Sequence, residues 1–223
     1  MKKIVGVMLI AVMLVCMLLG CSKSPNESKY DLSEELRECM IGDTILMGKY
    51  RQTRREKDGV DPIQWIVVAK ENDKVLLVSY YVLDYQKYHD GDTDNVDWET
   101  SSVRKWLNET FYNNAFDSSE KDRILTSNIL DYYSSSSTYT LDRLFFLSSQ
   151  EIYSDYKMSE RRTESSYPTD YASGLGATGD YWLRDTSKES STATIEWERH
   201  GGEIEQSKNE YCGVRPAMWV KVN

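Results

Sequence analysis

The chain has 223 residues, with 36 acidic and 27 basic side chains and a formal net charge of −9. This excess of acid excludes nucleic acid and anionic lipid headgroups as favoured partners, because like charges repel. The length is sufficient for one sizeable domain with its own core. Sixteen tyrosines and six tryptophans against four phenylalanines favour amphipathic aromatic side chains, which suit strand faces and binding surfaces.

The N-terminus is typical of a secretory signal that ends at a lipid-attachment site. Lys2 and Lys3 precede an uncharged apolar run over residues 4–19. The motif Leu18-Leu19-Gly20-Cys21 resembles the lipobox of bacterial lipoproteins, which implies acylation of the Cys21 thiol and attachment to the outer face of the cell membrane. An uncleaved transmembrane anchor is the alternative, since the apolar run approaches the length that spans a bilayer.

Cleavage before Cys21 would divide the chain into a signal peptide and a mature part that begins with a tether. Residues 1–20 are predicted as the signal peptide, 21–40 as a lipidated tether with a short helix, and 41–223 as a single domain. Outside the cytoplasm, a disulfide between Cys39 and Cys212 is chemically permitted. If the strand at 44–50 pairs antiparallel with the last strand, however, these thiols lie at opposite ends of the ladder. We therefore expect two free, buried thiols.

Short β-rich runs lie toward both ends of the chain. Residues 75–78 are apolar on both faces, which predicts a central strand. In the last run, alternate residues are wholly apolar, which indicates a half-buried strand, and Pro216 within it requires an edge or a bulge. The expected strands are 44–50, 63–70, 74–81, 129–133, 143–147, 181–184, 192–197 and 213–222, with a hairpin turn at 200–202.

Short helices and long loops separate these strands. Ser101 and its neighbours precede an apolar helical face that starts at Val103, and residues 117–120 cap a further turn. Residues 148–151 form a capping box. The polar stretch 158–180 is predicted as a long loop, of the kind that is functional when it lies within a domain. Together these patterns predict an α+β domain whose terminal strands lie together.

Six motifs occur in order along the chain. They are Gly42-Asp43-Thr44-Ile45-Leu46-Met47-Gly48-Lys49-Tyr50, Ile63-Gln64-Trp65, Trp98-Glu99-Thr100-Ser101-Ser102-Val103-Arg104-Lys105-Trp106-Leu107-Asn108, Phe146-Leu147-Ser148, Tyr181-Trp182-Leu183-Arg184 and Gly213-Val214-Arg215-Pro216-Ala217. This ordered set resembles a bacterial family, the domain-of-unknown-function family 6273, over roughly residues 41–222. The resemblance implies a C-type-lectin-like fold shared with sulfatase-modifying factors, in which the last strand pairs with the first. It implies no established activity.

An acidic stretch that contains Asp90, Asp92 and Asp94 is the one candidate for calcium. It does not form an EF-hand, because Asn95 and Ser101 occupy the places that require glycine and glutamate. A calcium site of another kind stays an alternative, but a solvated acidic loop is favoured. The sugar-binding triplets Glu-Pro-Asn and Gln-Pro-Asp are absent from the sequence. We therefore predict no cofactor.

Catalysis is the weaker hypothesis. The copper-binding relatives among the sulfatase-modifying factors use closely spaced cysteines, whereas Cys39 and Cys212 are far apart in the sequence. An iron site of three histidines cannot be assembled from His89 and His200 alone. No local signature of a nucleophile accompanies them. A metal-assisted oxidase or hydrolase thus rests on analogy of fold alone.

Three arginines recur near tryptophans, namely Arg104 near Trp106, Arg184 near Trp182 and Arg215 near Trp219, and two interpretations are open. Buried guanidinium groups near indoles would hold long loops onto the sheets, which we favour. Alternatively, these side chains form a binding surface, where Trp and Arg are preferred anchors. The candidate ligand-binding residues on the second interpretation are Trp98, Arg104, Trp182, Arg184, Arg215 and Trp219.

The sequence therefore favours a lipid-anchored binding or interaction module outside the cytoplasm. Its expected partners are the membrane, through lipid on Cys21, and a glycan or a protein at the cell surface. The binding hypothesis requires that the stretches 84–99 and 158–180 line one shared pocket with convergent polar groups. An extracytoplasmic enzyme is the alternative function.

Overall fold

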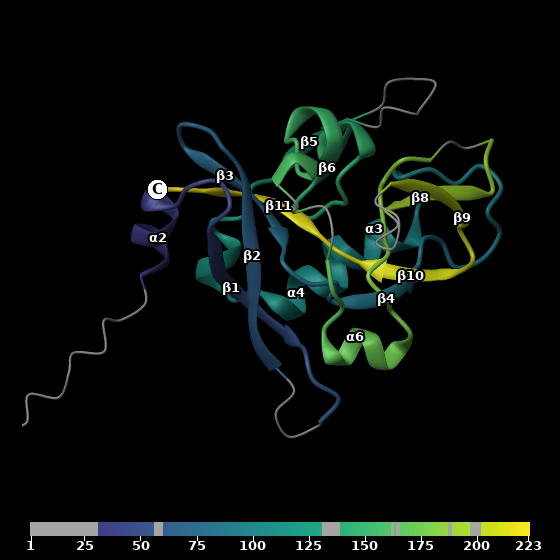
Figure 1. Ribbon diagram of the computed structural model, residues 1–223, viewed down its shortest axis with the longest axis horizontal. Helices are drawn as coiled ribbons and strands as arrows, with labels where there is room; N and C mark the ends of the chain where they lie inside the picture. Colours follow the sequence, from purple (N-terminus) through teal and green to yellow (C-terminus); the bar gives the residue numbers. More distant parts are fainter. Residues whose placement is uncertain are drawn as a thin grey trace, which may run out of the picture. The chain divides into compact units, whose positions relative to one another are not determined.

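Two β-sheets form the framework of the compact unit Leu32–Asn223 (Figure 1). The computed structural model describes residues 31–55, 60–130, 139–161, 163, 166–186, 189–196 and 202–223. The predicted signal peptide and Cys21 therefore lie outside the described residues, as do 131–138, Trp197 and the expected turn at 200–201. Within the described residues, no helix is long and apolar enough to cross a membrane.

The first sheet is antiparallel and has four strands in the order β1-β2-β3-β11. Val75 to Val78 are buried on both faces of β3, as predicted, because β3 lies between β2 and β11 and the core covers both of its sides. A bulge in β1 lies near Gly48, whose positive φ of 68° favours glycine. The strands are β1 (Thr44–Arg51), β2 (Val60–Lys70), β3 (Lys74–Ser79) and β11 (Ala217–Lys221).

The second sheet has five strands in the order β4-β10-β7-β8-β9 and contains one parallel pair, β10 with β7. A separate hairpin is formed by β5 and β6. Antiparallel pairing of β8 with β9 agrees with the expected hairpin there. The strands are β4 (Asp84–Lys87), β10 (Tyr211–Val214), β7 (Tyr181–Trp182), β8 (Thr192–Glu196), β9 (Glu203–Ser207), β5 (Ser127–Leu130) and β6 (Tyr139–Asp142).

The C-terminal segment differs from the single half-buried strand that the sequence predicted. It forms two strands, and the chain crosses from the second sheet to the first at Arg215 and Pro216 (Figure 1). Pro216 has no N–H for a ladder, so the break falls there, while its carbonyl accepts a hydrogen bond from the Ser79 N–H at 2.9 Å. Both faces of the segment are buried from Cys212 to Val220, because elements of both sheets cover it.

The expected pairing of the first and last strands is wrong. β1 and β11 form opposite edges of the four-stranded sheet, because the β2–β3 hairpin lies between them. A hairpin closed by the three residues 71–73 is a local pairing, which forms at a lower entropic cost than a pairing of the chain ends. Cys39 and Cys212 are nevertheless both free and buried, as predicted, although the ladder on which that prediction rested does not exist.

The helices are short, and their caps were predicted correctly. The Ser101 hydroxyl accepts from the Arg104 N–H at 3.3 Å, and Asp117 and Glu120 form a reciprocal capping box. Leu36 is fully buried, so α2 belongs to the compact unit. The helices are α2 (Leu32–Glu38), α3 (Ser102–Trp106), the π-helical η2 (Leu107–Phe111), α4 (Tyr112–Ala115), α5 (Ser118–Lys121), η3 (Glu151–Asp155), η4 (Ser159–Arg161) and α6 (Asp170–Leu175).

Two further predictions were wrong in part. Residues 143–147 do not form a strand, since only Phe145 makes an isolated bridge, to Ala217 of β11. The stretch 158–180 contains α6, which Thr169 caps and which ends at Gly176 with a left-handed φ of 120°. The observed class is a mixed α+β fold, built mostly of sheets, with few short helices and a curled sheet.

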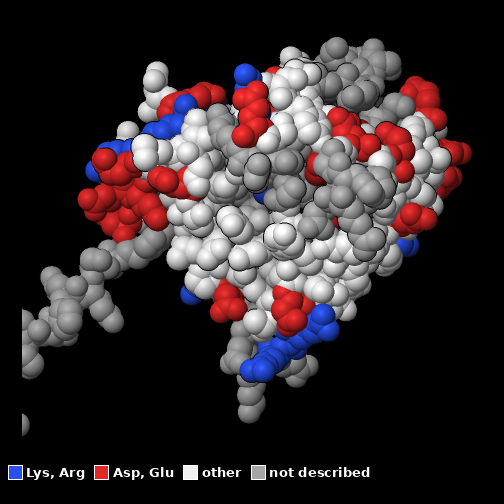
Figure 2. Space-filling model, viewed as in Figure 1, with Lys and Arg blue, Asp and Glu red and all other residues white. Residues whose placement is uncertain are grey.

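Acidic side chains gather on the face shown in Figure 2 over α2 and around the strands β8 and β9. A broad uncharged surface lies between these two acidic areas (Figure 2). This distribution agrees with the acidic composition of the chain.

Candidate functional site

Five of the six candidate ligand-binding residues are buried. Trp98, Trp182, Arg184, Arg215 and Trp219 are each 8% exposed or less, whereas Arg104 is partly exposed and lines a surface hollow of about 510 Å³. This burial favours the interpretation that these side chains hold the fold together.

Arg184 and Arg215 bind backbone carbonyls of loops and strand ends, as the structural interpretation requires. Arg184 donates to the carbonyls of Leu130 and Phe146 at 3.0 and 2.7 Å, and to the Glu151 carboxylate at 2.5 Å. Arg215 donates to the carbonyls of Ser79 and Thr163. The indole N–H of Trp182 donates to the Gln86 carbonyl. The Trp219 ring makes a cation–π contact with Lys74, whose Nζ lies 4.2 Å from the ring centre.

Trp98 and Arg104 are brought together by a buried carboxylate. Asp142 accepts the Trp98 indole N–H at 3.0 Å, the Arg104 Nε–H at 2.8 Å and the Thr140 hydroxyl at 2.6 Å. The guanidinium of Arg104 also reaches the Glu99 carbonyl at 3.0 Å. These bonds hold α3 and the loop before it against β6. The Arg104 guanidinium thus already donates hydrogen bonds to two protein acceptors.

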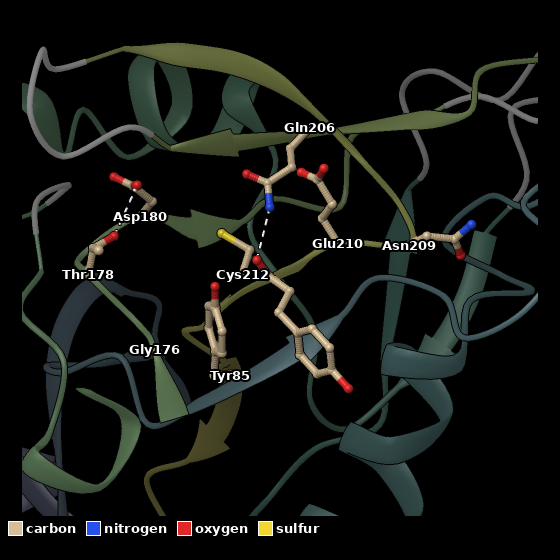
Figure 3. Close-up of a pocket in the computed structure, with 9 residues that line it drawn as sticks. Tyr85, Gly176, Thr178, Asp180, Gln206, Asn209, Glu210 and Cys212 are labelled. Atoms are coloured by element: carbon tan, nitrogen blue, oxygen red, sulfur yellow. Dashed lines mark hydrogen bonds between the residues drawn. The ribbon is translucent and has the colours of Figure 1, made fainter. Parts of the chain in front are cut away.

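A different region carries the features of a binding site. A hollow of about 560 Å³ lies over β4 and β10, and this volume is within the range of about 300–1,000 Å³ that is typical of small-ligand sites. The stretch 84–99 contributes Tyr85 to its lining, and the stretch 158–180 contributes Gly176, Thr178 and Asp180. Asp180 and Thr178 lie across it from Gln206 and Glu210 (Figure 3).

Close approach of β10 to the chain before β7 forms one wall of this hollow. A Cβ atom on Gly213 would lie 2.3 Å from the Asp180 carbonyl oxygen and 2.7 Å from Val82, so only glycine fits there. The parallel pairing of Gly213 with Tyr181 depends on that fit. The strand register therefore positions Asp180 beside β10.

Two tyrosines form the aromatic part of the hollow. The rings of Tyr85 and Tyr211 are stacked, with centroids 5.6 Å apart and planes inclined by 28°. Tyr211 is half exposed and offers part of its ring to a ligand. Tyr85 lies against Gly176, where an added Cβ would approach its ring to 2.9 Å, so the helix end holds this ring in place.

Polar side chains around the two rings are held in fixed orientations. The Gln206 amide donates to the Tyr211 carbonyl at 2.9 Å, and the Thr178 hydroxyl donates to Asp180 at 3.0 Å (Figure 3). Side chains fixed in this way lose little entropy when a ligand binds. A carboxylate, an amide and phenol groups thus converge on an aromatic surface, which is the pattern of a recognition site.

The electrostatics of the hollow favour binding over nucleophilic chemistry. Burial, and then the nearby Asp180 carboxylate, raise the pKa of the Cys212 thiol to about 12, so it stays protonated at neutral pH. Burial also raises the pKa of the Tyr85 hydroxyl, which therefore remains a hydrogen-bond donor. None of the described residues that line the hollow is a histidine, lysine or arginine, so it offers no base of that kind to Cys212.

The three aspartates considered for calcium do not converge. Asp90 pairs with Lys87 at 2.9 Å, and the Asp92 carboxylate accepts the Asp94 N–H at 3.1 Å. In the part of the chain that the structure describes, no group of three or more His, Cys, Asp or Glu side chains is arranged to hold a metal ion.

Sequence reasoning did not identify Tyr85, Tyr211 or Gln206 as site residues. The abundance of tyrosine and the length of the stretch 158–180 were the available signals, and the second correctly indicated one wall of the hollow. What the sequence could not indicate is the β10–β4 pairing, which brings Tyr211 opposite Lys87 and next to Tyr85.

Comparison with known proteins matches residues 72–222 to a domain of unknown function, DUF6273. The matched segment begins after both β1 and β2, so the motifs at 42–50 and 63–65 lie outside it. No curated protein matches the chain, and no solved structure matches it.

Proposed function

Because this chain belongs to the DUF6273 family, which carries no described activity, we propose a function from the hollow itself: a binding module that recognises a glycan at the cell surface. The observation that carries the proposal is the stacked pair of Tyr85 and Tyr211, surrounded by oriented polar side chains. On this proposal the module is anchored outside the cytoplasm by lipid on Cys21.

The chemistry of a sugar ring matches that of the hollow. A sugar ring has an apolar C–H face and a rim of hydroxyls, so it needs an aromatic surface beside amide and carboxylate groups. Tyr211 supplies exposed ring area, while Asp180 and Gln206 lie within the same lining. The carboxylates of Asp180 and Glu210 repel anionic ligands, so the hollow favours neutral or amino sugars over acidic ones.

The proposal retains a C-type-lectin-like relationship as a hypothesis about ancestry of the fold. Short helices, long connections and a last strand that passes through the core support it, whereas the separation of β1 from β11 argues against it. An experimentally solved relative with the same strand order would decide the matter.

A glycan array tests the proposed function. The purified full chain is applied to neutral, amino and acidic glycans, with Tyr211→Ala as the variant and Tyr139→Ala as the control, since Tyr139 is also exposed but lies on β6. We expect binding to neutral or amino glycans, weakened at least tenfold, or about 1.4 kcal/mol, in Tyr211→Ala alone. Absence of binding to every glycan on the array contradicts the proposal.

The proposed location has a separate test. Cells are supplied with a labelled fatty acid, and the chain is recovered from the membrane fraction. We expect the label and the membrane association to disappear in Cys21→Ser. Both should persist in Cys39→Ser, because the thiol of Cys39 is buried in the domain and is not the predicted attachment site. If Cys21→Ser retains the label, Cys21 is not the site of lipid attachment and this part of the proposal is wrong.

A further inference from the structure

A second, smaller hollow lies directly beside the first. It has a volume of about 200 Å³ and is lined by part of β4 and by α3, including Lys87, Ser102 and Trp106. Tyr211 lines both hollows. The two hollows therefore adjoin along one strand pair, with a single half-exposed ring between them.

Strand register explains why one ring serves both hollows. In the antiparallel pair of β4 and β10, Tyr211 lies opposite Lys87, and Gly213 lies opposite Tyr85. Side chains at alternate positions share a face, so Tyr85, Lys87 and Tyr211 all project from the same side. Tyr85 and Tyr211 occupy diagonal positions of this pair, and their rings stack in the lining of the first hollow.

The second hollow differs from the first in size and charge. Its volume falls below the range typical of a complete small-ligand site, so it suits one additional unit of a longer ligand. Lys87 lies 5.4 Å from the centre of the Tyr211 ring and pairs with Asp90, which makes this end close to neutral. The first hollow, by contrast, carries Asp180 and Glu210.

We infer that the ligand is a chain of at least two sugar rings, which crosses Tyr211 and places one ring in each hollow. This inference rests on the proposed glycan-binding function and adds the length of the ligand and its position. The ring in the first hollow packs beside Tyr85 and Tyr211. The next ring contacts Trp106 and the Lys87–Asp90 pair, and Tyr211 contributes to the binding of both.

Titrations with oligosaccharides of defined length test the inference. Cello-, manno- and chito-oligosaccharides of one to six units are titrated into the full chain by calorimetry. We expect the affinity in at least one series to rise at least tenfold from one ring to two and then to level off, because two hollows accept two rings. Tyr211→Ala weakens binding of every length in that series.

Two variants distinguish the second hollow from the first. Trp106→Leu removes an aromatic side chain from the wall of the second hollow. Lys87→Ala removes a side chain that is not part of the core, so this variant remains informative if Trp106→Leu unfolds. We expect both to abolish the gain from the second ring while affinity for a single ring changes less than about twofold. Lys105→Ala is the control, since Lys105 is on the same helix but does not line this hollow.

The outcomes separate the inference from the function on which it rests. If a single ring binds as tightly as longer chains, the inference is wrong and the proposed function stands. If the gain from the second ring persists in both variants, the second ring lies elsewhere and the inference is again wrong. If no saccharide binds in these series or on the array, the proposed function fails, and the inference fails with it.

Discussion

Arg215 donates from Nη1 to the Tyr181 hydroxyl at 3.0 Å, and its guanidinium carbon lies 4.9 Å from the centre of the same ring. The remaining donors reach the carbonyls of Ser79 and Thr163 at 3.0 and 2.9 Å. A single buried side chain thereby connects the end of β3, strand β7 and the stretch after η4. It does so at the point where the chain passes from one sheet to the other.

Arg215→Ala is expected to destabilise the domain by about 3 kcal/mol or more. Two buried acceptors and the partly buried Thr163 carbonyl would lose a charged donor, and each such bond contributes about 1.5–3 kcal/mol. Arg215→Lys should be intermediate, because an ammonium cannot reproduce the planar set of donors. Urea unfolding of the full chain measures the change. Arg143→Ala, at an exposed arginine, should stay within about 0.5 kcal/mol, and equal stability of Arg215→Ala and wild type would refute this role.

Gly213→Ala should disrupt the contact between β10 and the chain before β7. The added Cβ would meet the backbone oxygen of Asp180 at 2.3 Å, and backbone cannot move aside as a flexible side chain can. We expect a loss of several kcal/mol in the free energy of unfolding, together with weaker glycan binding in any variant that folds. Gly202→Ala is the matched control, since nothing lies within 4 Å of its added Cβ, and it should be neutral or slightly stabilising.

Local chemistry explains most of what the sequence predicted correctly. The caps at Ser101, Asp117 and Ser148 depend on residues three positions apart, and the β2–β3 hairpin depends on a short turn between two apolar runs. The central position of β3 followed from its apolar residues on both faces. Such features are decided within about ten residues and need no knowledge of the fold.

The errors arise where distant segments decide the outcome. Residues 213–222 alternate as one strand would, yet the segment divides at Pro216 because each half pairs with a different sheet. Lys208 lies in the polar segment between β9 and β10, yet it is fully buried and donates to the Val96 carbonyl at 2.5 Å, a contact with a residue distant in the sequence. The hollow beside Tyr85 likewise depends on the β4–β10 register, which no local pattern specifies.

The pair of Ser149 and Asp185 leads to a prediction on pH. The Ser149 hydroxyl lies 2.5 Å from the Asp185 carboxylate and 2.6 Å from that of Glu203. One hydroxyl carries one proton, so it can donate to only one of them, and the second contact needs a protonated carboxyl group. Burial raises the pKa of Asp185 to about 6, against the lowering effect of its bonds from Ser149 and of the Arg184 charge.

Stability should therefore decrease as the pH rises from about 4 to about 6. The folded protein binds the Asp185 proton more tightly than the unfolded chain does, so ionisation over this interval favours unfolding. The difference between about 6 and the ordinary 3.8 corresponds to about 3 kcal/mol. Urea unfolding at several pH values should show this slope in wild type and lose it in Asp185→Asn. The exposed Asp94→Asn should keep the slope, and an identical slope in Asp185→Asn would exclude Asp185 as its source.

The thiol of Cys212 should be unreactive in the folded protein, although it lies in the wall of the hollow. The thiolate is the reactive species, and a pKa of about 12 leaves very little of it at pH 8. We expect iodoacetamide to modify Cys212 at least a hundredfold more slowly in the native chain than in urea, as followed by mass spectrometry of its peptide. Cys39, whose thiol pKa is also raised by burial, serves as the internal comparison. Rapid modification of Cys212 alone in the native chain would instead indicate an activated thiol and would restore the enzymatic hypothesis.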